Sequence, residues 1–329
     1  MKFKLAIVFA IALILGFTGN NTTAQTEVEI PEESVKIGIA RWVESESFLD
    51  NIEGFKGSLE EYGFIEGVNV EYFEKNAYAE KQKQREIIQE FIEDDVDLIY
   101  SLTTPGTLIA KEMTSEIPIV FSIVTFPVDA KIIDSFESSG NNLVGTSNFV
   151  SVGKQVDLIY DITKAKTIGF FHRNGEPNSE IQYMEMKDYA LSKEIEIIKI
   201  DPLNLEGTED AINKKISKVD VLYNACDTLV QSGGEEISIK IGLENNKPSF
   251  SCNKGGIQKG ALAGNVADFE VIGKLAGNKA VIVLHGGNPS DILSEKQRGD
   301  HIFVNQETAK ILKIEFPTHL ENIILERFD

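Results

Sequence analysis

Short apolar runs alternate with segments of helical periodicity along most of this chain. The predicted strands of the first half are residues 35–40, 68–73, 96–102 and 117–124. The segments of helical spacing between them are residues 48–62, residues 82–92 and a stretch that enters through the turn 103–106 and ends at Met113. Strands and helices that alternate at these lengths predict an α/β fold, in which helices cover both faces of a parallel sheet.

The second half repeats this plan. Its predicted helices are residues 152–162, 181–191 and 209–216, and its first predicted strands are residues 167–171 and 195–200. The sequence VDLIYSLTT at 96–104 is echoed by VDVLYNACD at 219–227, and each precedes a helix and then a strand opened by proline. The echo predicts two similar Rossmann-like lobes, with crossings near residues 141–153 and 261–269. Lobes joined by several strands form a hinge and a cleft that closes around a small ligand.

The stretch TIGFFHRNGEPNSE, residues 167–180, is organised as a strand, a loop and a helix that starts at Ser179. In a parallel sheet the loop after a strand faces the ligand crevice, which places Glu176, Asn178 and Ser179 where a small molecule is bound. The Glu176 loop is expected to be wetter than Asp227. An ordinary turn with an N-cap serine stays open as the alternative.

The N-terminus has the three-part pattern of a secretory signal peptide. Lys2 and Lys4 precede an apolar run at 5–17, and small residues at Thr22 and Ala24 predict cleavage after Ala24. The alternative, an uncleaved anchor, is disfavoured because the run is shorter than the roughly 20 residues of a spanning helix. We therefore expect an exported protein that is periplasmic or extracellular and associated with the cell surface.

The net charge of the chain disfavours one class of partner, nucleic acids. The 329 residues carry a formal net charge of -20, and removing two lysines with the signal peptide makes it -22. So acidic a surface, without a basic patch, argues against a nucleic-acid partner. The four histidines and two cysteines show no metal-ligand spacing, so we expect no metal and no cofactor.

The two cysteines, Cys226 and Cys252, are predicted at the cleft ends of neighbouring strands. A disulfide would suit an exported protein. Adjacent parallel strands present unfavourable vectors for that bond, which favours two buried thiols. Both states stay open on the sequence.

A set of ordered motifs covers nearly all of the mature chain. It comprises VKIGIARWVE, GFKGSLEEYGFIEGVNVEY, VDLIYSLTTP, IPIVFSIVT, NNLVGTSN, IGFFHRNGEPNS, VDVLYNACDT, KPSFSCNKGGIQKGALA, GNPSDI and VNQETAKILKIEFP. In this order the chain resembles the solute-binding proteins of ABC transporters, of the tryptophan or tyrosine transporter substrate-binding type.

The resemblance implies a periplasmic binding protein type I fold without catalysis. A monomer would carry a small molecule, often an aromatic amino acid, to a permease in the membrane. The implied organisation is a signal peptide (1–24), a linker (25–34), an N-terminal lobe (35–147 and 269–292), a C-terminal lobe (148–268 and 293–317) and a tail (318–329). Relatives are often lipoproteins, but no cysteine precedes Cys226 here.

The family's ligand contacts carry over to a defined set of positions, which are Thr103, Thr104, the amides after Pro105 at Gly106, Glu176, Asn178, Ser179 and Asp227. An amino acid's carboxylate suits the helix N-terminus after Thr104. Its ammonium suits Asp227 or Glu176.

Three further positions shape the expected ligand. Trp42 either stacks on the ligand side chain or wedges between the lobes. Phe126 stands where relatives carry an aspartate, and Asn253 stands where an acid is common, so both are expected to change the contacts.

Two other functions compete with transport. An extracytoplasmic ligand sensor would use the same closure, and a neighbouring permease gene would favour transport over it. An enzyme could be drawn from Asp227 with Cys226 or His172, but the spacing offers no nucleophile elbow and no phosphate loop.

Overall fold

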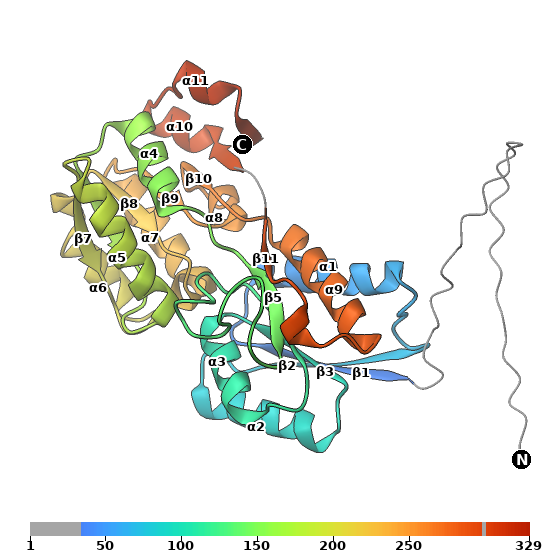
Figure 1. The fold of residues 1–329 in the computed structure, drawn as a ribbon. Helices are drawn as coiled ribbons and strands as arrows, with labels where there is room; N and C mark the ends of the chain where they lie inside the picture. The colour runs from blue at the N-terminus through green and yellow to red at the C-terminus, as the bar shows by residue number, and fades with distance from the viewer. Residues whose placement is uncertain (1–33, 298–300) are drawn as a thin grey trace, which may run out of the picture. The chain divides into compact units, whose positions relative to one another are not determined.

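The structure, a computed structural model, describes residues 34–297 and 301–329 (Figure 1). The predicted signal peptide and all but the last residue of the predicted linker lie outside the described residues. Across those described ranges, no helix has the length and apolar character needed to cross a bilayer.

The N-terminal sheet has the strand order β11-β5-β4-β3-β1-β2, and all its pairings are parallel. Its strands are β1 (Val35–Arg41), β2 (Val70–Asn76), β3 (Leu98–Leu102), β4 (Ile119–Ser122), β5 (Leu143–Ser147) and β11 (Glu295–Lys296). The helices and the one short 3-10 turn that accompany it are α1 (Glu46–Glu61), α2 (Lys81–Glu93), α3 (Thr104–Met113), α9 (Phe269–Leu284) and η3 (Pro289–Asp291).

The C-terminal sheet has the order β13-β12-β10-β9-β8-β6-β7, and it is parallel except between β10 and β12. Its strands are β6 (Thr167–Phe171), β7 (Glu196–Ile200), β8 (Val221–Asn224), β9 (Ser249–Ser251), β10 (Ala263–Asn265), β12 (Ile302–Asn305) and β13 (Ile324–Phe328). Its helical elements are α4 (Val152–Thr163), α5 (Pro177–Leu191), α6 (Thr208–Asn213), η1 (Ile216–Lys218), η2 (Val230–Gly234), α7 (Glu235–Glu244), α8 (Lys254–Gln258), α10 (Gln306–Leu312) and α11 (Thr318–Glu321).

The predicted α/β fold with two similar parallel sheets is confirmed. In the N-terminal sheet β1 lies between β2 and β3, and in the C-terminal sheet β6 lies between β7 and β8. The two echoed sequences therefore form equivalent strands, β3 and β8. The strand β3 is buried along its whole length, as expected for a strand covered on both faces.

Two helices begin earlier than the sequence predicted. The helix expected from Ser179 begins at Pro177, because extended Glu176 is its N-cap and proline is favoured in the first turn. The turn expected at 103–106 already contains the start of α3, which has Pro105 in its first turn. Asn178 and Thr104 thus lie in first helical turns instead of loops, and Ser179 is the third residue of its helix instead of the first.

Helix α9 follows β10 of the C-terminal sheet but packs on α1 of the N-terminal half. The approach is close because glycines face the partner backbone. A Cβ atom on Gly273 would lie 2.1 Å from the Asn51 carbonyl oxygen, and one on Gly54 would lie 2.3 Å from the Glu270 carbonyl oxygen. This helix pair therefore anchors a late segment of the chain to the N-terminal sheet.

We expect Gly273→Ala to destabilise the protein by about 1–3 kcal/mol, because α1 and α9 must separate to admit a methyl group. Gly57→Ala is the matched control, since a Cβ atom on this α1 glycine would have no described atom within 4 Å. It should instead stabilise the protein by about 0.5–1 kcal/mol. Urea denaturation measures both changes, and equal midpoints for the two variants would contradict the packing argument.

Candidate functional site

Segments that follow the carboxyl ends of strands in both sheets supply the residues that the sequence predicted. Trp42 and Thr103 follow β1 and β3 directly, and Asp227 comes shortly after β8. Helix α3, which follows Thr103, contacts helix α5, which carries Asn178 and Ser179. The structure thus brings the helix that follows β3 against the helix that follows β6, at the carboxyl ends of strands, where open α/β sheets bind ligands.

The N-terminal half-site consists of Trp42, Gln84, Thr103, Thr104 and Gly106. A Cβ atom on Gly106 would lie 3.6 Å from the Trp42 Cβ, 3.6 Å from the Thr103 Oγ1 and 3.4 Å from the Gln84 Nε2, so these residues form one cluster. The Trp42 Nε1 and the hydroxyls of Thr103 and Thr104 are buried and have no hydrogen-bond partner among the described residues.

The backbone of Thr103 has φ 73° and ψ 157°, a conformation that β-branched residues rarely adopt. Such strain persists where the surrounding structure imposes it, and it is concentrated at functional sites. At the start of α3 it joins the end of β3 to the first helical turn, where backbone amides lack intrahelical partners. This arrangement suits a carboxylate.

The C-terminal half-site consists of Glu176, Asn178, Ser179 and Asp227. The Asn178 Nδ2 donates to the Cys226 carbonyl oxygen at 2.5 Å. Its Oδ1 is buried and accepts no hydrogen bond from any described residue. Asn178 therefore presents an oriented acceptor, which suits an ammonium group.

Ser179 contacts His172 beneath this half-site, with the Oγ 3.2 Å from the imidazole Nδ1. The His172 ring lies parallel to the Tyr183 ring, and burial lowers the pKa of His172 to about 4. The imidazole is therefore neutral at pH 7, and its Nε2 is buried without a hydrogen-bond partner among the described residues.

Glu176 lies in the segment after β6 and Asp227 in the segment after β8. Each of these acids accepts a hydrogen bond from a backbone amide of the other segment. The Glu176 carboxylate accepts from the Thr228 amide at 3.0 Å and from the Thr228 hydroxyl at 2.5 Å. The Asp227 carboxylate accepts from the Arg173 amide at 2.6 Å and from the Val230 amide at 2.9 Å. We call this arrangement the carboxylate clasp, because each segment holds the main chain of the other.

Both acids of the clasp are buried, with exposed fractions of 5% for Glu176 and 2% for Asp227. Glu176 turns inward as the N-cap of α5, but the loop that carries it is more exposed than the segment around Asp227, as predicted: Asn174 and Gly175 are exposed, whereas residues 225–229 are buried. Burial, followed by the nearby Asp227 charge, raises the pKa of Glu176 to about 8. Burial also raises the pKa of Asp227, although less, because backbone amides stabilise its charged form.

Phe126 and Asn253 have contacts that differ from those of the half-sites. The Phe126 ring meets the Phe149 ring edge-on at 5.5 Å, which gives an apolar wall. The Asn253 side chain accepts from the Gly256 amide as the N-cap of α8, and it donates to the Glu235 carboxylate. Its polar atoms are thus already engaged within the protein.

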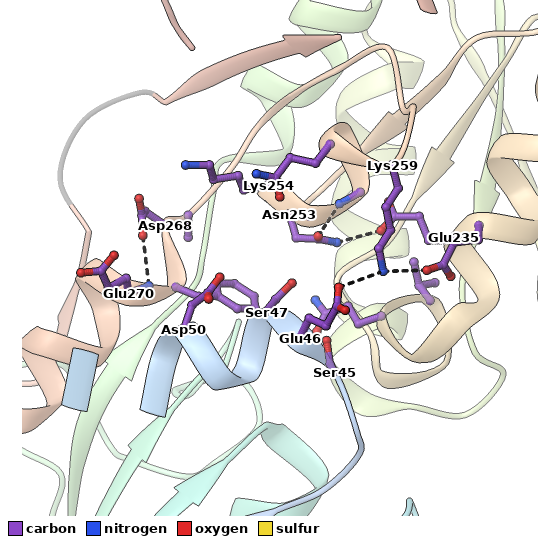
Figure 2. A pocket seen from close by; sticks show the side chains of 18 residues that line it. Ser45, Glu46, Ser47, Asp50, Glu235, Asn253, Lys254, Lys259, Asp268 and Glu270 are labelled. Atoms are coloured by element: carbon purple, nitrogen blue, oxygen red, sulfur yellow. Dashed lines mark hydrogen bonds and ion pairs between the residues drawn. The ribbon is translucent and has the colours of Figure 1, made fainter. Parts of the chain in front are cut away.

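A cavity of about 310 Å³ lies beside Asn253 and the N-termini of α1 and α9 (Figure 2). Lys259 pairs there with Glu236 at 2.6 Å and approaches Glu46 of α1 at 3.9 Å. The charged residues of its described lining are Glu46, Asp50, Glu235, Glu236, Lys254, Lys259, Asp268 and Glu270. An acidic lining of this kind disfavours the carboxylate of an amino acid.

Two polar residues that were not predicted from the sequence resemble those of the half-sites, because each has a buried polar atom without a hydrogen-bond partner among the described residues. The Asn148 Oδ1 and the Gln84 Oε1 are buried and accept no hydrogen bond from the described part of the chain. Asn148 directly follows β5, so its place at a strand end was a usable signal. Gln84 lies inside α2 and gave no signal, because only the packing of α2 against α3 brings it to Gly106.

Cys226 and Cys252 form a disulfide with a Cα–Cα distance of 5.5 Å. The geometric objection that favoured free thiols does not apply, because neither cysteine lies in a paired strand position. Pairing of β8 with β9 ends at Asn224 and Ser251, so both cysteines lie in the segments beyond it. Irregular backbone allows the side-chain vectors to converge.

The two sheets and their strand-end site define a periplasmic binding protein type I-like fold. The structure superposes on an ABC domain in complex with L-Trp from Streptococcus pneumoniae with a TM-score of 0.86, at 23% identity, covering 90% of this chain and 100% of that one. It superposes on the ligand-free, open structure of a substrate binding protein with adhesive properties from Clostridium difficile with a TM-score of 0.69, at 32% identity and the same coverage.

The chain belongs to the family of ABC transporter substrate binding proteins, whose family model matches residues 36–325. It is 32% identical over 315 residues to the tyrosine-binding protein of Clostridioides difficile (strain R20291), covering 94% of this chain and 91% of that protein. It is therefore a solute-binding protein and not an enzyme, and its family context implies a permease as partner. Proteins of this kind typically work outside the cytoplasm.

The raised pKa of Glu176 predicts a pH dependence of folding. Because the folded pKa of about 8 exceeds the ordinary value of 4.5, the folded protein holds this proton more tightly than the unfolded chain. This contribution to stability is complete below about pH 4.5 and is lost as the pH rises to about 8. Glu176→Gln removes the titration and should gain about 1–3 kcal/mol relative to wild type between pH 5 and pH 8.

Urea titrations of the ligand-free protein at these two pH values measure that gain. Glu206→Gln, at an exposed position, is the control and should follow wild type. A difference between Glu176→Gln and wild type that does not change with pH would contradict the assignment.

Proposed function

We propose that the chain binds the zwitterion of an aromatic L-amino acid between the two half-sites and delivers it to an ABC permease. The observation that carries this proposal is the set of buried polar atoms without protein partners at Trp42, Thr103, Thr104, Asn148 and Asn178, among the residues that the structure describes. Such atoms cost free energy unless a ligand pairs with them.

The chemistry of these atoms divides between the two half-sites. Threonine hydroxyls and the first turn of α3 donate to a carboxylate. On the C-terminal side, the Asn178 Oδ1 and the carboxylate clasp accept from an ammonium group. Trp42 and the Phe126–Phe149 pair supply aromatic surface for a ring.

The named relatives support the same ligand class. One is a tyrosine-binding protein at 32% identity, and a structurally similar ABC domain was solved with L-Trp. We choose the half-sites over the acidic cavity of Figure 2 because its carboxylates would repel the ligand carboxylate.

The same proposal includes export and domain organisation. Residues 1–24 would act as a signal peptide cleaved after Ala24. An amino-acid ligand would bring together an N-terminal lobe of residues 35–147 with 269–296 and a C-terminal lobe of residues 148–268 with 301–329. These bounds differ from the expected 292 and 317, because β11 pairs with β5 of the N-terminal sheet and β13 pairs with β12 of the C-terminal sheet. Mass spectrometry of the exported protein tests the cleavage site, since a mature chain that retains residue 24 would contradict it.

Titration calorimetry with L-tyrosine, L-tryptophan and L-phenylalanine tests the ligand class. We expect binding of at least one, and much weaker binding of tyramine, which lacks the carboxylate, and of 3-(4-hydroxyphenyl)propanoate, which lacks the ammonium. Trp42 is the chain's only tryptophan, so its fluorescence should change in step with the calorimetric isotherm. Equal affinity for an amino acid and its two truncated analogues would overturn the zwitterion assignment.

Thr104→Val tests the carboxylate contact. The Thr104 hydroxyl has no protein partner among the described residues, so the substitution should leave the melting temperature of the ligand-free protein unchanged or higher. Loss of a hydrogen bond to a charged group costs about 1.5–3 kcal/mol, or roughly ten- to a hundred-fold in affinity.

Thr107→Val is the matched control one turn further along α3. Its hydroxyl lies 3.1 Å from the Ser101 Oγ, and both are buried. This variant should therefore lower the melting temperature while affinity changes by less than about threefold. The opposite pattern in the two variants would exclude a ligand contact at Thr104.

A further inference from the structure

The Cys226–Cys252 disulfide is adjacent in sequence to two residues of the predicted site. These are the only two cysteines of the chain, and each directly precedes a polar residue of the predicted site, Asp227 and Asn253. Both cysteines are buried within the apolar cluster of the C-terminal sheet. A covalent bond thus joins the segments that leave β8 and β9.

The main chain of Cys226 orients the acceptor of the C-terminal half-site. Its carbonyl oxygen accepts from the Asn178 Nδ2 at 2.5 Å, and its amide donates to the Gln182 Oε1 at 3.2 Å. Since the Asn178 Nδ2 is held by this carbonyl, the Oδ1 is the atom left to accept from a ligand. The next residue, Asp227, forms one half of the carboxylate clasp through the Arg173 amide.

Cys252 is fixed from the other side by the network around Asn253. The Asn253 Oδ1 accepts from the Gly256 amide at 2.8 Å, and the Asn253 Nδ2 donates to buried Glu235 at 3.0 Å. Backbone pairing between β8 and β9 ends at Asn224 and Ser251. The disulfide therefore continues the connection between the two segments past their last paired residues.

We propose that this disulfide is a redox-sensitive positioning element of the ligand site, and that its reduction by a small-molecule thiol lowers ligand affinity. The inference rests on the proposed amino-acid function. In the first step a thiolate attacks one cysteine sulfur, the bond between the cysteines breaks, and a mixed disulfide forms. A second thiolate then attacks the mixed disulfide and releases the second cysteine sulfur. Two small-molecule thiols are thereby oxidised to one disulfide, and both cysteines are reduced and gain a proton.

Reduction affects the site because two thiol sulfurs cannot approach as closely as two bonded ones. The surrounding apolar cluster is close-packed, so the separation moves main chain as well as side chains. Movement of the Cys226 carbonyl releases the Asn178 amide and shifts Asp227 within the clasp. Both changes act on the acceptors offered to the ligand ammonium.

The test compares the L-tyrosine affinity of the oxidised protein with that of the same protein reduced by dithiothreitol. We expect a dissociation constant at least threefold higher after reduction, restored by reoxidation, with circular dichroism showing that the fold persists. Cys226→Ala with Cys252→Ala is the matched control. Because it has neither the bond nor the two sulfurs, dithiothreitol should not change its affinity, and a loss of affinity in this variant on adding dithiothreitol would overturn the inference.

Hydrogen exchange of the ligand-free protein gives a readout that needs no ligand. Reduction should speed exchange over residues 173–182 and 224–231. If the oxidised protein binds none of L-tyrosine, L-tryptophan and L-phenylalanine but exchange accelerates on reduction, the proposed function fails and the positioning role stands. An affinity change below threefold, unchanged exchange over both segments, or two free thiols in the exported protein would overturn the inference.

Discussion

The carboxylate clasp is the interaction on which the C-terminal half-site depends. Glu176, after β6, binds the main chain and hydroxyl of Thr228, and Asp227, after β8, binds the main chain of Arg173. These hydrogen bonds hold together two segments that belong to separate strand–helix units. They also place two acids in a buried environment, where they cannot both be charged at low cost. The raised pKa of Glu176 and the Arg173 guanidinium, which lies 3.9 Å from the Glu176 Oε2, limit this cost.

The N-terminal half-site differs from the C-terminal one because it offers mainly hydrogen-bond donors. Its donors come from a helix start that follows a strained residue, Thr103, and from hydroxyls that no described side chain pairs with. One half-site thus offers hydrogen-bond donors beside a positive helix terminus, and the other offers acceptors beside the Asp227 carboxylate. Under the proposed function, this polarity would set the direction in which a zwitterion lies.

The fold could be predicted because the hydrophobic pattern of the sequence alternates between short apolar runs, which form buried strands, and segments of helical periodicity. The echo of VDLIY by VDVLY even identified the equivalent strands β3 and β8. Helix starts were harder, because Pro177 and Pro105 look like turn residues until the N-cap geometry is known. The candidate residues at strand ends were also accessible, since topology alone places them together.

Partners of those residues could not be predicted. Asp227 or Glu176 was expected to accept from a ligand ammonium, but no signal in the sequence indicated that each carboxylate also accepts from an amide of the other's segment. Gln84 joins the site only through a contact between α2 and α3, its Nε2 lying 3.5 Å from the Gly106 carbonyl oxygen. Strand geometry argued against a disulfide, and only the irregular segments beyond β8 and β9 permit it. In each case the deciding fact is the path of the main chain after a strand has ended, which the hydrophobic pattern does not encode. That same path determines whether Asn178 offers its oxygen or its nitrogen to a ligand, because the Cys226 carbonyl makes the choice.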